Sequence, residues 1–98
     1  MDIDSELRQI SSILGTCNEE AFRIEDLQTH IDRVWQIIDK NKRSINDIVL
    51  NKICSMMTKL AIVIDAYKAK MIRFENLKVY IEREKLANNL VDISKTVI

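Results

Sequence analysis

The chain has 98 residues, with no proline and a single glycine, Gly15. This length suffices for one domain, and so few turn residues exclude an all-β protein or a loop-rich enzyme. The apolar content of 47% excludes a disordered chain. The formal net charge is zero, whereas a nucleic-acid-binding domain is normally basic as a whole. Composition therefore predicts a single all-α domain.

The sequence predicts an intracellular protein, located in the cytoplasm or the nucleus. Its first residues are acidic and lack the basic start and apolar block of a secretory signal. Two cysteines in such a chain are expected to stay reduced. The apolar stretch 48–72 contains Lys52, Lys59 and Asp65, each of which would cost roughly 2.5–3.5 kcal/mol at the centre of a bilayer. We therefore expect no membrane span there.

The first predicted helix runs over about 3–39. Apolar residues recur along it at alternating spacings of four and three, which is the pattern of a heptad seam. The seam consists of Ile3, Leu7, Ile10, Leu14, Cys17, Ala21, Ile24, Gln28, Ile31, Trp35 and Ile38. Gly15 is unfavourable inside a helix, and Thr16 with Glu19 has the spacing of a capping box. We favour a continuous helix; the alternative is a short first helix and a compact three-helix bundle.

A polar turn at about 40–44 separates this helix from a second one, predicted over about 45–87. Ser44 could cap its start, with Asp47 in the first turn. Its heptad seam consists of Ile53, Met56, Leu60, Val63, Tyr67, Lys70, Phe74, Leu77 and Ile81. Asn88 and Asn89 are the next expected break, followed by a short apolar tail at 90–98.

The two seams predict an antiparallel two-helix coiled-coil hairpin. A turn near residues 41–44 aligns nearly the whole of both seams and sets, for example, Ile24 against Leu60 and Ile3 against Ile81. The same register places Cys17 beside Tyr67. Cys54 would then lie too far from Cys17 for an intrachain disulfide.

Further apolar residues lie beside the seams, on both flanks of the hairpin. They are Leu50, Met57, Ile64 and Met71 on the second helix and Ile13, Leu27 and Val34 on the first. One hairpin cannot cover both flanks. We therefore expect these residues to form an interface, either with a second copy in a homo-oligomer or with a helical protein partner that completes a helical bundle. The alternative is that the segments before Gly15 and after Asn89 fold over them.

The residues of this chain do not form a recognisable catalytic, cofactor or metal site. His30 is the only histidine and falls at a solvent-facing heptad position without a second ligand at suitable spacing. A single glycine rules out a glycine-rich loop that cradles phosphate. The sequence thus predicts a non-enzymatic interaction or assembly subunit with a structural or adaptor role.

Nucleic-acid binding through the basic second half of the chain is the alternative function. Residues 41–98 hold 11 bases and 6 acids. The cations that would carry this function are Lys68, Lys70, Arg73, Lys78, Arg83 and Lys85. Their heptad positions scatter around the helix, and no aromatic residues alternate with them to stack on bases. We therefore expect protein partners rather than nucleic acid.

Overall fold

The computed structural model describes residues 3–15 and 18–97, and within this part every regular element is a helix. The elements are α1 (Ile3–Gly15), α2 (Ile24–Asn41), the short 3-10 helix η1 (Lys42–Ser44), α3 (Asp47–Lys68), α4 (Phe74–Arg83) and α5 (Leu86–Val97). The prediction of an all-α fold is confirmed. The two long helices of the prediction are instead divided among α1 to α4, and α5 lies mostly in the predicted tail.

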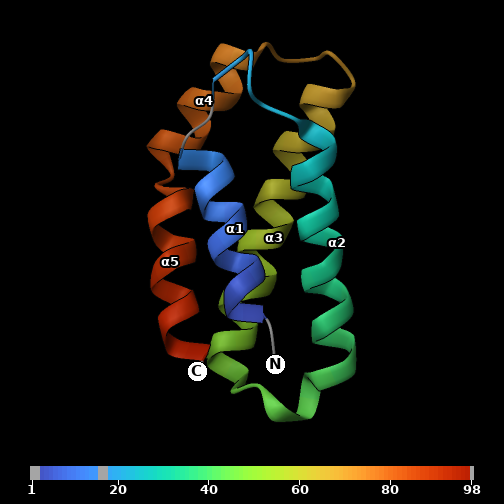
Figure 1. Ribbon diagram of the computed structural model, residues 1–98, viewed down its shortest axis with the longest axis vertical. Helices are drawn as coiled ribbons and strands as arrows, with labels where there is room; N and C mark the ends of the chain where they lie inside the picture. Colours follow the sequence, from blue (N-terminus) through green and yellow to red (C-terminus); the bar gives the residue numbers. More distant parts are fainter. Residues whose placement is uncertain (1–2, 16–17, 98) are drawn as a thin grey trace.

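The helices alternate in direction along the long axis of the molecule (Figure 1). In the view of Figure 1, α1 runs upward, α2 downward and α3 upward, and α4 and α5 together return downward. α1 packs against α2 on one side and against α5 on the other, while α3 contacts α2, α4 and α5. The first and last helices, far apart in the sequence, therefore lie side by side.

The contact between α1 and α5 is the most extensive in the fold. α1 buries residues at helical spacings of four and three, from Ile3 to Leu14. Three small residues lie along the contact: Ser11, Ala87 and Ser94. The Ser11 hydroxyl donates a hydrogen bond to the Ala87 carbonyl oxygen over 2.7 Å, so its buried polar group is paired. Small side chains let two helix backbones approach closely, which explains how this pair packs.

The prediction of a continuous helix over 3–39 is wrong, because α1 ends at Gly15 and α2 begins only at Ile24. After residues 16 and 17, Asn18 forms a turn: its side-chain oxygen accepts from the Ala21 N–H, and its carbonyl oxygen accepts from the Phe22 N–H. Thr16 of the expected capping box lies outside the described residues. The alternative of a short first helix that ends near Gly15 is therefore correct, and α1 is a separate helix that packs beside α2.

The turn between α2 and α3 lies close to its predicted place, but a different residue caps α3. Asn46 is the N-cap, and its side-chain oxygen accepts from the Ile48 N–H over 2.9 Å. Ser44 belongs to η1 instead. Ile45 is extended and buried, so the chain enters the core before it can start a helix. Asp47 lies in the first turn of α3, as expected.

The predicted second helix is wrong beyond Lys68, where a Schellman motif ends α3. The Met71 N–H bonds to the Ala66 carbonyl, and the Lys70 N–H bonds to the Tyr67 carbonyl. Lys70 has a positive φ of 60°, in the left-handed region where glycine is usual. A non-glycine residue there costs about 1–2 kcal/mol. No glycine or proline marks this end in the sequence.

A second break, at Glu84 and Lys85, divides α4 from α5. Lys85 also has a positive φ, of 51°. The Asn89 side chain, within α5, donates a hydrogen bond to the Glu84 carbonyl oxygen over 3.1 Å. This bond gives a partner to a carbonyl group at the C-terminal end of α4. The break predicted at Asn88 and Asn89 is therefore wrong. The predicted apolar tail is mostly helix, and Leu90 is fully buried in it.

These breaks also overturn the predicted pairing at the end of the long hairpin that lies away from the turn. Leu14, at the C-terminal end of α1, lines the same hollow as Ile81, whereas Ile3 lies at the opposite end of α1. The expected pair of Ile3 with Ile81 is thus replaced. Tyr67 packs against Phe22 and Phe74, with ring centroids 6.0 and 6.4 Å away. Its predicted neighbour Cys17 lies outside the described residues. The expected absence of a disulfide between Cys17 and Cys54 therefore stays a prediction.

We predict that Lys70→Gly stabilises the protein by about 0.5–1 kcal/mol, because it relieves the left-handed strain at the end of α3. Urea unfolding followed by circular dichroism measures this. Lys52→Gly is the matched control, because Lys52 is exposed within α3 and the same change should destabilise there by about 1 kcal/mol. Equal destabilisation by both changes would contradict the left-handed conformation of Lys70 at the end of α3.

We predict that Leu90→Ala lowers the free energy of unfolding by about 2–5 kcal/mol, because it leaves a cavity where α5 meets the core. Leu90 is fully buried, whereas Val79 on α4 is 57% exposed. Val79→Ala should therefore change stability by less than about 0.5 kcal/mol. Equal, small effects in chemical denaturation would show that α5 is a loose tail.

Candidate functional site

The chain itself covers most of the surface that the sequence predicts to need a partner. Leu27, Val34, Met57 and Ile64 are all fully buried in the core, which includes residues of α1 and α5. A second copy or a partner helix cannot reach them in this fold. For these four residues the structure follows the alternative of self-coverage, because α1 folds back beside α2, and α5 packs against α1 and α3.

The other three predicted interface residues are more accessible. Ile13 and Leu50 are partly buried and pack against the core. Met71 is 78% exposed and follows the left-handed Lys70 in the link between α3 and α4. Only Met71 therefore offers a largely free apolar side chain among the seven predicted residues.

Two large apolar residues that the sequence argument did not select are also exposed, and they lie close together. Ile62 on α3 is 67% exposed, and Val79 on α4 is 57% exposed. Both line a groove of about 400 Å³ between these helices. The groove, called the α3–α4 groove below, is lined by Ile62, Val63, Ala66, Ile72, Asn76, Val79, Tyr80 and Arg83.

Helical periodicity explains why these residues share one groove. Ile62 and Ala66 are four apart on α3, and Asn76, Val79 and Arg83 follow one another at spacings of three and four on α4. Ile72, in the link, closes the end at which the chain turns from α3 to α4. In a long two-helix hairpin Ile62 and Val79 would both face solvent, which is why the heptad pattern did not single them out.

Arg83 has a defined position at the other end of the groove. Its guanidinium carbon lies 5.7 Å from the centroid of the Tyr80 ring, a cation–π contact. Within residues 3–15 and 18–97, Arg83 forms no ion pair. The groove therefore combines an apolar floor with one positioned positive charge that is available to a ligand.

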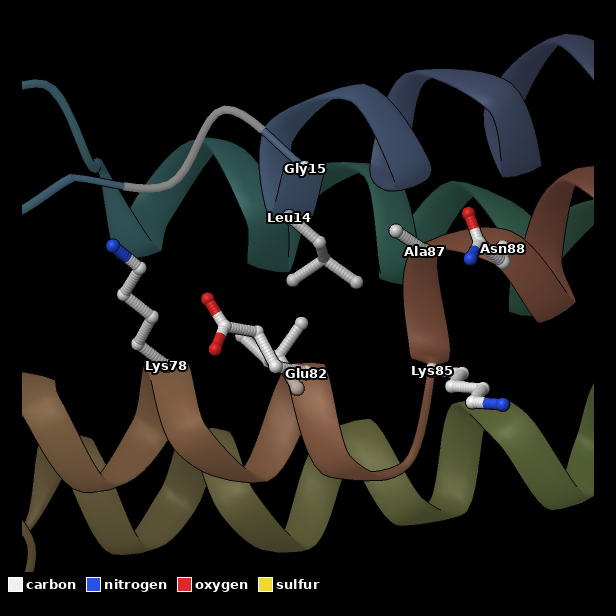
Figure 2. A pocket seen from close by; sticks show the side chains of 8 residues that line it. Leu14, Gly15, Lys78, Glu82, Lys85, Ala87 and Asn88 are labelled. Atoms are coloured by element: carbon white, nitrogen blue, oxygen red, sulfur yellow. The ribbon is translucent and has the colours of Figure 1, made fainter.

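A second hollow, of about 250 Å³, lies where the break between α4 and α5 meets the end of α1. Figure 2 shows Leu14 and Glu82 pointing into it from opposite sides, while Lys85 points away. Lys78 stands at its edge, and Ile81 contributes apolar surface. Its charged groups do not converge on one point, so we interpret it as a consequence of the helix break.

His30 is not the solvated surface residue that its heptad position predicts. Its Nδ1 lies 2.6 Å from Glu6 Oε2, and the two side chains are only 16% and 12% exposed. Arg33 approaches the other Glu6 oxygen at 3.7 Å. The expectation was wrong because α1, which supplies Glu6, packs beside α2. No nucleophilic side chain in the described part of the chain bonds to His30, so the pair fastens two helices together.

The cations proposed for nucleic-acid binding line three different hollows. Lys68, Lys70 and Arg73 surround the turn between α3 and α4, together with the acidic Glu25. Lys78 and Lys85 line the hollow at the end of α1, and Arg83 lines the α3–α4 groove. Such a distribution does not make a continuous track for a phosphate backbone.

The described residues include no group of three or more His, Cys, Asp or Glu side chains placed to hold a metal ion. Cys54, on α3, is a partly buried free thiol. None of the helices in the described ranges is both long enough and hydrophobic enough to cross a bilayer.

Comparison of the chain with protein-family models, with curated proteins and with solved structures gives no match.

We predict that Glu6 and His30 are energetically coupled by about 0.5–1.5 kcal/mol, because their bond joins α1 to α2 at a mostly covered position. A double-mutant cycle with Glu6→Ala and His30→Ala, measured by urea unfolding, gives this value. The control is the pair of Gln28 and Asp32, whose side chains bond over 2.9 Å at an exposed site within α2. Its coupling should be only about 0.2–0.5 kcal/mol. Additive losses for Glu6 and His30 would show that the contact contributes nothing.

Proposed function

We propose that this protein is a non-enzymatic helical interaction module that serves as a structural or adaptor subunit of a protein assembly. The observation that carries this proposal is the α3–α4 groove, in which Ile62 and Val79 are exposed on adjoining helices. Exposed apolar residues scattered singly are ordinary, whereas a group in a groove is typical of a binding site. Ile48, 66% exposed at the start of α3, is not among the residues that line the groove.

The way the rest of the chain is packed supports binding rather than a defect of the fold. The core is continuous from α1 to α5, and among the described residues no buried side-chain polar atom lacks a hydrogen-bond partner. The polar groups of the groove are an amide, a phenol and a guanidinium, from Asn76, Tyr80 and Arg83. These groups orient a ligand but offer no activated nucleophile with an adjacent base.

The burial of the predicted flanking stripes changes which partner we favour. The expectation of a homo-oligomer or a helical partner rested on uncovered flanks of the hairpin, but the chain's own core encloses Leu27, Val34, Met57 and Ile64. The remaining apolar surface is confined largely to the side of α3 and α4. A surface of this size suits one segment of a different protein better than an extensive bundle interface between copies.

The test places a photo-crosslinking amino acid at Val79 of the full chain, expressed in its native cells. We expect ultraviolet-dependent cross-links to protein, identified by mass spectrometry, because position 79 lies in the groove. The same substitution at Ile48 is the matched control, since that side chain is similarly exposed but does not line the groove. Cross-links at 79 should disappear when Ile62→Asp is added.

A yield of protein cross-links at position 79 no higher than at position 48 would contradict the proposed function. Cross-links from 79 chiefly to nucleic acid would favour the alternative of a nucleic-acid-binding protein instead. That alternative also predicts binding that weakens by orders of magnitude over a few-fold rise in salt.

A further inference from the structure

The shape of the α3–α4 groove suits one helix. Its two walls are helices, and α4 has 10 residues, which is about 15 Å of wall at 1.5 Å per residue. The apolar positions Ile62, Ala66 and Val79 lie on both walls. A helix that lies between two others buries one apolar stripe, with residues at spacings of three and four, against both of them.

Positive charges lie at both ends of this groove. At one end Arg83 is held over Tyr80, and Lys59 lies one helical turn before Val63, on the same face of α3. At the other end Lys70 and Arg73 line, with Ile72, the hollow that adjoins the groove. Lys68 and one acid, Glu25, also line that hollow, so its lining is basic on balance. Among the described residues none of these cations forms an ion pair.

The acidic residues of the same helices face elsewhere. Glu82 points into the hollow beside Leu14, on another face of α4 (Figure 2). Glu75 is two helical turns before Glu82 and therefore shares that face. Neither Lys59 nor Asp65 is among the groove's lining residues, but helical geometry places Lys59 on the Val63 side of Ile62 and Asp65 on its far side. The groove is thus apolar along its length and basic at each end.

Building on the proposed function, we infer that the groove binds an amphipathic helix of a different protein, with acidic residues flanking its apolar stripe at both ends. Acidic side chains there would meet Lys59 and Arg83 at one end and Lys70 and Arg73 at the other. A second copy of this chain is disfavoured, because pairing groove to groove in either direction sets cations of one copy against cations of the other.

The test uses the full chain and synthetic helical peptides of about 14 residues, long enough to span α4. Three peptides share one apolar stripe and carry Glu, Gln or Lys at both ends. Fluorescence anisotropy measures their affinities, and amide chemical shifts of the labelled protein locate the site. We expect the Glu peptide to bind about tenfold or more tightly than the Lys peptide. Its shifts should concentrate in residues 59–66 and 72–83.

Variants of the protein test the roles of the charges and of the apolar floor separately. Lys59→Glu with Arg83→Glu should abolish the preference for the Glu peptide over the Lys peptide, because only Lys70 and Arg73 remain to attract acidic residues. Circular dichroism should stay unchanged because both substituted side chains are exposed. Ile62→Asp should lower the affinity for every peptide that binds, because it places a charge in the apolar floor of the groove. The control is Lys95→Glu, a charge reversal at another exposed position, on α5 and outside the groove. It should leave all affinities unchanged.

Each contrary outcome identifies what fails. Equal binding of the Glu and Lys peptides would overturn the charge inference and leave the proposed function standing. Cross-links at position 79 without binding of any peptide would overturn only the inference that the groove binds an amphipathic helix. A concentration-dependent dimer in sedimentation, lost on Val79→Asp, would assign the groove to a second copy. Failure of both the peptides and the cross-links would overturn the proposed function as well.

Discussion

The packing of this fold depends on the apolar character of α3 around most of its circumference. Ile53, Leu60, Met57 and Ile64 lie on adjacent faces of that helix, and all four are fully buried. A single neighbouring helix covers only one stripe of such a surface. The chain covers the rest by packing α5 against both α1 and α3. The chain thereby completes its own core. This matters because a protein of this length buries relatively little surface and would be only marginally stable with an incomplete core.

The same solution determines where apolar surface remains. The break at Lys85 separates α4, which stays beside α3, from α5, which lies along α1 (Figure 1). The outer side of α3 and α4 receives no further helix from the described part of the chain, and Ile62 and Val79 stay exposed there. The groove therefore exists because α5 is used to cover α1 and the core and not the outer side of α3 and α4. Its position follows from the helix breaks at Lys70 and Lys85, which end α3 and α4.

The charges around this groove favour one class of partner over another. The basic second half of the sequence does not form one continuous positive face, because its cations line three separate hollows. Around the α3–α4 groove, however, the positive charges stand at the ends of an apolar surface. Such an arrangement supports recognition of a protein segment, in which apolar contacts provide affinity and the charges select the partner and its orientation.

Local periodicity is enough to predict the helical class and most of the buried positions. Ile3, Leu7, Ile10 and Leu14, and later Ile53 and Leu60, are predicted seam residues that the structure buries. Helix ends were harder to predict: Lys70 and Lys85 take left-handed conformations that glycine usually marks, and their cost is met by packing elsewhere in the chain. Of the candidate site, the seven predicted interface residues included the exposed Met71 but missed Ile62 and Val79. Which apolar stripes the chain covers itself could not be read from local pattern, because that coverage depends on α5 reaching α1 from the opposite end of the sequence.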